Sequence, residues 1–150
     1  MMITWFWKPF GALSSTELYD IMRARQQVFI IEQTCFYSDL DGADLYSWHL
    51  IGHTLEIGLA AYLRVLMPGA QRPEPAIGRV LTVASMRGKG LGRQLIAEGL
   101  KRAQQQFPGQ DIVLSAQCHL VALYQEFGFQ SVGEPYVEDG IPHVDMRIKS

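Results

Sequence analysis

A short glycine-rich, basic stretch at positions 87–92, with the sequence RGKGLG, has the composition of an anion-binding loop. Glycines have no Cβ, so the backbone of such a stretch can approach a ligand closely. A helical pattern begins at its end, and the unpaired N–H groups and positive dipole end of a helix N-terminus attract negative charge. With the nearby basic residues, these features predict a phosphate or pyrophosphate site. The residues predicted to form it are Arg87, Gly88, Lys89, Gly90, Leu91, Gly92 and Arg93.

The spacing of the glycines excludes two common phosphate-binding motifs. A dinucleotide-binding loop would need a further glycine where Arg93 stands, and a Walker loop would need four residues between its glycines, followed by Gly-Lys-Ser or Gly-Lys-Thr. The pattern that fits is R-x-x-G-x-G between a strand and a helix. The alternative is a flexible glycine-rich turn in which the basic residues are incidental.

The elements around this loop predict an α/β fold. An apolar strand at 77–83 precedes the loop, and a helix from Leu91 to Phe107 follows and ends at Pro108-Gly109. Ser14 and Glu17 have capping-box spacing and begin another helix of about four turns. Leu120 to Phe127 predicts a short helix closed by Gly128. The alternation predicts a mixed sheet with helices on both faces. The predicted strands are 3–10, 47–52, 57–65, 77–83, 112–116, 129–137 and 143–148.

Length and composition predict one ordinary globular domain, residues 1–150. The formal net charge is −2, so bulk electrostatics give no indication of a nucleic-acid partner. No apolar run is long enough to span a membrane, and the N-terminal residues lack the pattern of a signal peptide. Cys35 and Cys118 have no metal-ligand spacing, and two free thiols fit a cytoplasmic location, which we expect for this chain.

An acidic segment from Glu32 to Asp44 lacks helical or strand periodicity. Asp39, Asp41 and Asp44 superficially resemble a calcium loop, but the spacing to glycine and the terminal glutamate are absent, so we expect no metal. Two interpretations stay open: an acidic loop at the mouth of a substrate site, suited to a cationic partner, or a solvated loop without a role.

Four stretches together resemble the GNAT acetyltransferase superfamily and, within it, the ElaA-like group. Residues 77–100 are similar to the superfamily's cofactor motif, and LYQEFGF at 123–129 is similar to its next motif. The VFIIEQ stretch at 28–33 with the acidic segment, and EDGIPH at 138–143, resemble ElaA-like sequences. The resemblance covers nearly the whole chain. It implies a mostly antiparallel sheet in which two neighbouring parallel strands splay apart, with helices on both faces.

The resemblance also implies a co-substrate and its binding residues. Acetyl-coenzyme A (acetyl-CoA) would enter between the splayed strands, with its pyrophosphate on the loop of residues 87–93. Its pantetheine arm would bond to the main chain of the first splayed strand, which matches Val80, Leu81 and Thr82. Ala84 stands where many members have proline, and no acidic residue lies on strand 77–83, where some members keep a catalytic glutamate.

Three residues are candidates for acid–base chemistry. Tyr124 matches the position where many members place a tyrosine near the coenzyme sulfur, so we expect it to be the general acid; the alternative is a core tyrosine. Because no glutamate lies on the cofactor strand, the base must come from elsewhere, and Glu32 and His143 are the candidates, acting directly or through water. A structural hydrogen bond for Glu32 and a packing role for His143 are the alternatives.

These residues together predict an N-acetyltransferase that transfers an acetyl group from acetyl-CoA to an unidentified primary amine of a small molecule or protein. The competing hypothesis is a non-catalytic acyl-CoA-binding sensor or regulatory module. Terminal strands in such folds often pair across a two-fold axis, which makes a homodimer a further expectation.

Overall fold

A single mixed sheet forms the centre of the protein, and the computed structural model describes residues 2–150. Within those residues the sheet has seven strands in the order β1-β2-β3-β4-β5-β7-β6. Every neighbouring pair is antiparallel except β4 and β5, which are parallel. The strands are β1 (Thr4–Pro9), β2 (Ser47–Thr54), β3 (Gly58–Leu66), β4 (Ala76–Thr82), β5 (Ile112–Gln117), β6 (Gln130–Glu138) and β7 (Ile141–Ile148).

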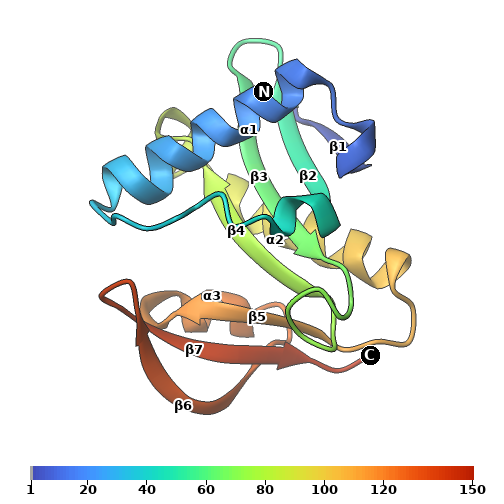
Figure 1. Ribbon diagram of the computed structural model, residues 1–150, viewed down its shortest axis with the longest axis vertical. Helices are drawn as coiled ribbons and strands as arrows, with labels where there is room; N and C mark the ends of the chain where they lie inside the picture. The colour runs from blue at the N-terminus through green and yellow to red at the C-terminus, as the bar shows by residue number, and fades with distance from the viewer. Residues whose placement is uncertain (1) are drawn as a thin grey trace.

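Helices cover both faces of this sheet, as predicted. In Figure 1, α1 (Ser15–Arg25) crosses in front of the strands and α2 (Leu91–Gln106) lies behind them. A third helix, α3 (Val121–Gln125), follows β5. The predicted order of strands and helices and the mixed sheet are therefore confirmed. Among residues 2–150, no helix is both long enough and apolar enough to cross a membrane.

The first helix begins as predicted but does not continue as a regular α-helix. The Ser14 hydroxyl accepts a hydrogen bond from the Glu17 amide at 3.0 Å, and the Glu17 carboxylate accepts one from the Ser14 amide at 2.8 Å, which completes the capping box. After Arg25 the chain forms a π-helix, η2 (Gln26–Glu32). The wider turn changes which side chains face the sheet, a feature that the apolar spacing did not predict.

Two apolar cores lie on the two faces of the sheet. The larger one joins α2 and α3 to the sheet, and the smaller one, which includes Ile21 of α1, contains Ile51, Tyr62 and Leu81. Gly99 allows α2 to approach β3 closely, because a Cβ there would lie only 2.5 Å from Leu63 Cδ2. Helix α2 therefore lies close against β3 at this point.

The parallel pair is joined over a very short length. Pairing between β4 and β5 is limited to Ala76 with Val113 and Ile77 with Leu114. Beyond Ile77 the two strands part, while β5 continues to pair with β7 along its whole length. The expectation of two splayed parallel strands is confirmed, and the gap lies in the middle of the sheet rather than at an edge.

Candidate active site

A cleft of about 460 Å³ opens where β4 and β5 part. Five segments form its walls: the end of η2 with the following loop, β3 with the loop after it, β4, β5 with α3, and the β6–β7 hairpin. Aromatic and polar side chains of the first segment, of β5 with α3 and of the hairpin line it: Phe29, Tyr37, Ser115, Tyr124, Tyr136 and His143. The cleft thus brings together segments that are more than a hundred residues apart in the sequence.

Tyr124, the predicted general acid, is placed in this cleft by α3. It is 6% exposed and its ring makes an edge contact with Phe129 at 6.1 Å between centroids. Burial raises the pKa of Tyr124 to about 12. The phenol is therefore fully protonated at neutral pH and can act as a proton donor.

His143, one of the two predicted bases, also lines the cleft. Its Nδ1 lies 2.7 Å from the Ile141 carbonyl oxygen, which can only accept, so Nδ1 carries the proton. In the neutral ring, Nε2 is then unprotonated and basic, and it lies 3.8 Å from the Glu138 carboxylate. The ring stacks on Tyr136, which fixes its orientation. His143 thus has the tautomer required of a proton acceptor.

A chain of hydrogen bonds crosses the cleft wall beside His143. The hydroxyls of Ser115 and Tyr136 are hydrogen-bonded to each other, and Tyr136 donates to Asp145 at 2.7 Å. Arg72 pairs with the same carboxylate at 3.1 Å. These bonds hold Tyr136, and with it the stacked imidazole, in one position.

Glu32, the other predicted base, has a different environment. It does not line the cleft and forms an ion pair with Arg87 at 2.8 Å. Arg87 in turn donates from Nε and Nη2 to the Thr82 carbonyl at 3.2 and 3.1 Å. Arg87 therefore connects the end of η2 to the end of β4.

The predicted phosphate loop has the backbone expected of an anion site, although it lies outside the cleft itself. Gly88 and Gly90 have φ of +77° and +78°, and Gly90 is the N-cap of α2, so the first amides of the helix follow directly. Gly92 has ordinary helical φ, and a Cβ there would meet no atom within 4 Å. The space above these amides is open.

The basic residues of the loop differ in whether they form ion pairs. Arg93 pairs with Glu126 at 3.1 Å, and both side chains are more than half exposed. Lys89 makes no ion pair within residues 2–150. An exposed ion pair contributes little to stability, so a phosphate that binds at the loop can replace Glu126 as the partner of the Arg93 guanidinium.

The three predicted residues of the cofactor strand differ in whether they line the cleft. Val80 lines it, whereas Leu81 is buried in the core beneath α1 and the Thr82 carbonyl is occupied by Arg87. Of the predicted site residues, the structure brings Val80, Tyr124 and His143 to one cavity.

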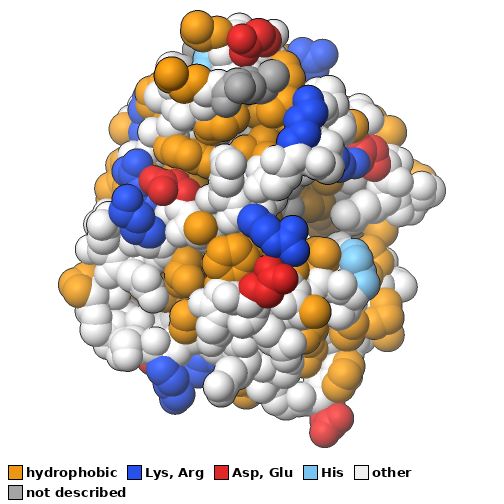
Figure 2. Space-filling view, turned by 180° about the vertical axis from the view of Figure 1, so that it is seen from behind, with side chains coloured by type: hydrophobic (Ala, Val, Ile, Leu, Met, Phe, Trp, Pro, Cys, Tyr) orange, Lys and Arg blue, Asp and Glu red, His pale blue; other side chains and the backbone are white. Residues whose placement is uncertain are grey.

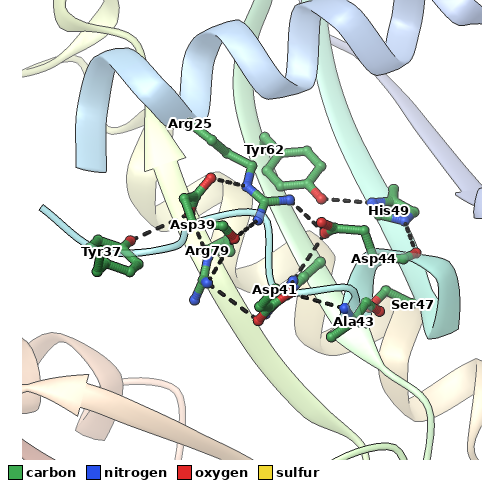
Figure 3. Close-up of polar contacts among 11 residues, drawn as sticks. Arg25, Tyr37, Asp39, Asp41, Ala43, Asp44, Ser47, His49, Tyr62 and Arg79 are labelled. Atoms are coloured by element: carbon green, nitrogen blue, oxygen red, sulfur yellow. Dashed lines mark hydrogen bonds and ion pairs between the residues drawn. The ribbon is translucent and has the colours of Figure 1, made fainter. Parts of the chain in front are cut away.

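The acidic segment is an internal ion-pair network rather than an open acidic surface (Figure 3). Asp39 binds Arg25 Nε at 2.9 Å and Arg79 Nε at 2.8 Å, and Asp44 binds Arg25 Nη1 at 2.5 Å. Asp41 binds Arg64 at 2.7 Å. Tyr37 and Asp41 place this segment at the cleft, so it is not a solvated loop away from any site. Its aspartates are paired with arginines from α1, β3 and β4, which leaves them little free negative charge.

The strength of this network is reflected in Asp41. Burial alone would raise the pKa of its carboxyl, but the hydrogen bonds and charge of Arg64 hold that pKa well below its usual range. Among residues 2–150, no group of three or more His, Cys, Asp or Glu side chains is arranged to hold a metal ion.

His49 extends the network into β2. Its Nε2 lies 3.0 Å from the Asp44 carbonyl oxygen and its Nδ1 lies 2.6 Å from the Tyr62 hydroxyl. Burial lowers the pKa of His49, so the ring is neutral, with Nε2 donating and Nδ1 accepting. This histidine is buried behind the network and has a structural role.

Sequence reasoning missed the three arginines of the network. Arg25 is completely buried, as its position within the apolar stripe of α1 implies. A charged residue at such a position was the one feature of the sequence that indicated a buried ion pair. A charged residue inside an apolar stripe requires a buried partner, and two aspartates, Asp39 and Asp44, 14 and 19 residues later, supply it.

Charges elsewhere on the surface are mixed. In Figure 2, which shows the molecule from behind, Lys and Arg side chains lie next to Asp and Glu rather than in one patch of a single sign. This face therefore has no continuous basic surface of the kind used to bind nucleic acids.

Comparison with known proteins agrees with this architecture. The model of the acetyltransferase (GNAT) domain matches residues 59–150. A UPF0039 protein of Synechocystis is 43% identical over 97% of this chain and 95% of its own. The crystal structure of Escherichia coli ElaA is 37% identical, covers 99% of this chain and 100% of its own, and has a TM-score of 0.92. An acyl-CoA N-acyltransferase from Pseudomonas aeruginosa, 39% identical over 98% and 99% of the two chains, also has a TM-score of 0.92.

Proposed function

Because the chain belongs to the GNAT acetyltransferase family, we propose that it is an acyl-CoA-dependent N-acyltransferase, which moves an acetyl group from acetyl-CoA to a primary amine of a small molecule or a protein. The observation that supports this most directly is the parting of β4 and β5 at a cleft that contains Tyr124 and His143. A protonated phenol and an unprotonated imidazole nitrogen can serve as the acid and the base in amine acylation.

The loop of residues 87–93 suits the pyrophosphate of the co-substrate. Backbone amides at the start of α2 would donate to the phosphate oxygens, and open space above Gly92 leaves room for them. Lys89 and the exposed arginines would add charge-assisted bonds. When bound, the thioester supplies an activated acyl group.

Tyr124 would protonate the departing thiolate. A thiol has a pKa near 8.5, so it is a fair leaving group even without help, and the donor lowers the barrier further. Since burial keeps the Tyr124 phenol protonated to about pH 12, the donor is available throughout the physiological range.

His143 would accept the proton of the amine at Nε2. An alkylammonium ion has a pKa near 10.4, so only about one molecule in a thousand is neutral at pH 7. A base in the cleft therefore accelerates the reaction, and acid–base assistance is typically worth about 10²- to 10⁴-fold. Glu32 is better explained as the partner that holds Arg87.

The charge of the cleft wall also favours a cationic acceptor. The arginines that line the cleft, Arg64, Arg72 and Arg79, are each paired with aspartates. Glu138 and Asp139 of the β6–β7 hairpin add two carboxylates to the lining of the cleft. An alkylammonium group would be attracted to this side of the cleft before it loses its proton to His143.

Thiol release from acetyl-CoA tests the proposed function directly. A panel of polyamines, amino acids and lysine-containing peptides should contain an acceptor that raises the release of free thiol at least tenfold above the rate without acceptor. Tight binding of acetyl-CoA without thiol release by any member of the panel would instead indicate a non-catalytic acyl-CoA sensor.

Gly92→Val should weaken acetyl-CoA binding by about tenfold or more, because each charge-assisted bond to the phosphate contributes about 1.5–3 kcal/mol and the side chain would displace it. The fold should tolerate the change, since a Cβ at this position meets no atom within 4 Å. Isothermal calorimetry measures the affinity. Gly11→Val, in the short 3₁₀ turn after β1 and equally unobstructed, is the matched control. Unchanged affinity in Gly92→Val would remove the loop from the binding site.

Tyr124→Phe should lower kcat by about 10- to 100-fold, at the low end of acid catalysis because the thiolate leaves readily. Because the phenol stays protonated to about pH 12, the wild-type kcat should not decline between pH 8 and 10 through loss of this acid. Tyr19→Phe is the matched control, because it makes the same change at an exposed tyrosine of α1 that does not line the cleft, and its kcat should stay at the wild-type level. Turnover close to wild type in Tyr124→Phe would exclude it as the acid.

His143→Gln should abolish the acidic limb of the pH profile of kcat/KM, because the protonated imidazole cannot accept the amine proton. In the wild type, kcat/KM should rise with pH and then level off. Glu32→Gln should keep that limb, since Glu32 lies outside the cleft. If the limb disappears in Glu32→Gln and persists in His143→Gln, the assignment of the base is reversed.

A further inference from the structure

Strand β4 contains one residue more than the part of β3 that it faces. Tyr62 lies opposite Leu81 and Arg64 lies opposite Gly78, so one residue of β3 is matched by two of β4. The first of those two, Arg79, has φ of +54°. This is a β-bulge, which bends a strand and increases its local twist.

The bulge reverses the two faces of β4. Ile77 and Leu81 are four residues apart and would share a face in a regular strand. Instead Ile77 packs in the core beneath α2 and Leu81 in the core beneath α1. Pairing with β5 ends at Ile77, two residues before Arg79. The bulge and the parting of the strands therefore occur at the same place.

The conformation of Arg79 is unfavourable for a residue with a Cβ and persists only where the surroundings hold it. Its guanidinium is held by the acidic segment: Nε donates to Asp39 Oδ1 at 2.8 Å, and Nη2 donates to the Asp39 carbonyl at 3.1 Å and to Asp41 Oδ2 at 3.4 Å. The Tyr37 ring lies 5.7 Å from the guanidinium carbon. We call these contacts of Arg79 with Asp39 and Asp41 the Arg79 clamp.

The two aspartates of the clamp are themselves fixed. The second carboxylate oxygen of Asp39 accepts from Arg25 of α1, which is fully buried, and Asp41 binds Arg64 of β3 in two places. Figure 3 shows Asp39 between the guanidinium groups of Arg25 and Arg79. The clamp therefore transmits the position of a helix and of a neighbouring strand to the bulge.

We propose that Arg79 is a positioning residue for acyl transfer: the Arg79 clamp holds the bulge of β4 and thereby sets the separation of β4 from β5 at the cleft. This rests on the proposed function. Tyr37 and Asp41 also line the cleft, so the Arg79 clamp links one wall of the cleft to the strand that would orient the thioester.

The variant Arg79→Gly distinguishes the effect of the clamp from the effect of backbone strain. Glycine adopts positive φ without penalty but has no side chain to bind Asp39. We expect kcat to fall by about 10- to 100-fold, the loss that follows from a displacement of about 1 Å at a reacting centre. The KM for acetyl-CoA should change less than threefold, because the phosphate loop is untouched. Arg79→Lys keeps the charge but not the paired Nε and Nη2 donors, and its kcat should be intermediate.

Arg147→Gly is the matched control. Arg147 is a partly exposed strand arginine that binds two carboxylates, Glu74 at 2.7 Å and Asp111 at 3.0 Å, away from the cleft. Its kcat should stay within twofold of wild type at a temperature where both variants are folded. A loss of kcat in Arg147→Gly equal to that in Arg79→Gly would overturn the proposal, as would an Arg79→Gly variant with wild-type kcat.

Hydrogen exchange tests the clamp without turnover. In Arg79→Gly the amides of residues 80–82 and 38–40 should exchange about tenfold faster than in wild type, whereas those of α2 should be unchanged. Exchange unchanged in both segments would overturn the clamp even if the wild type is an active acyltransferase. If the wild type acylates no amine while exchange rises as expected, the proposed function fails and the clamp stands as a structural device.

Discussion

A sheet interior rarely contains unpaired backbone, and the parting of β4 and β5 creates such a region here. Buried N–H and C=O groups need partners, because an unmade hydrogen bond away from water is costly. Beyond Ile77 the facing edges of the two strands must be satisfied by something other than each other. A ligand with alternating amide groups meets this need in the manner of an added strand. Under the proposed function, the unpaired edges of the parted strands would therefore bind the co-substrate.

The buried charges beneath α1 carry a second free-energy cost, the removal of charged side chains from water. Removing an arginine from water is offset only when several well-placed carboxylates surround it, as Asp39 and Asp44 surround Arg25. Removing one partner of such a pair typically costs about 3–5 kcal/mol, whereas an apolar replacement of the whole set can be neutral. Stability alone therefore does not explain the network. The network is instead explained by the positions of its residues, because its ion pairs join α1, β3 and β4 through one loop.

The sequence was sufficient to predict features that depend on local pattern. Periodicity located α2 and the strands, the spacing of Ser14 and Glu17 predicted the capping box, and the motifs predicted the family. It could not predict the π-helix after Arg25, since no glycine or proline marks it. Gly78 was a local signal for a bulge in β4, but the positive φ falls on Arg79 rather than on the glycine, which the pattern does not indicate. The pairing of Arg87 with Glu32 joins residues 55 positions apart, which local patterns do not encode.

The close contact between Gly99 and Leu63 has a consequence for how such a site can change over evolutionary time. A helix rises about 1.5 Å per residue, so Gly90 stands about 13 Å along α2 from the point of contact. The contact at Gly99 fixes the helix against the sheet, so the number of residues between Gly90 and Gly99 determines where the N-terminal amides lie. Inserting or deleting one residue between the two would shift the amides at its tip by a bond length and rotate them by about 100°, so this stretch should tolerate substitution far better than a change of length.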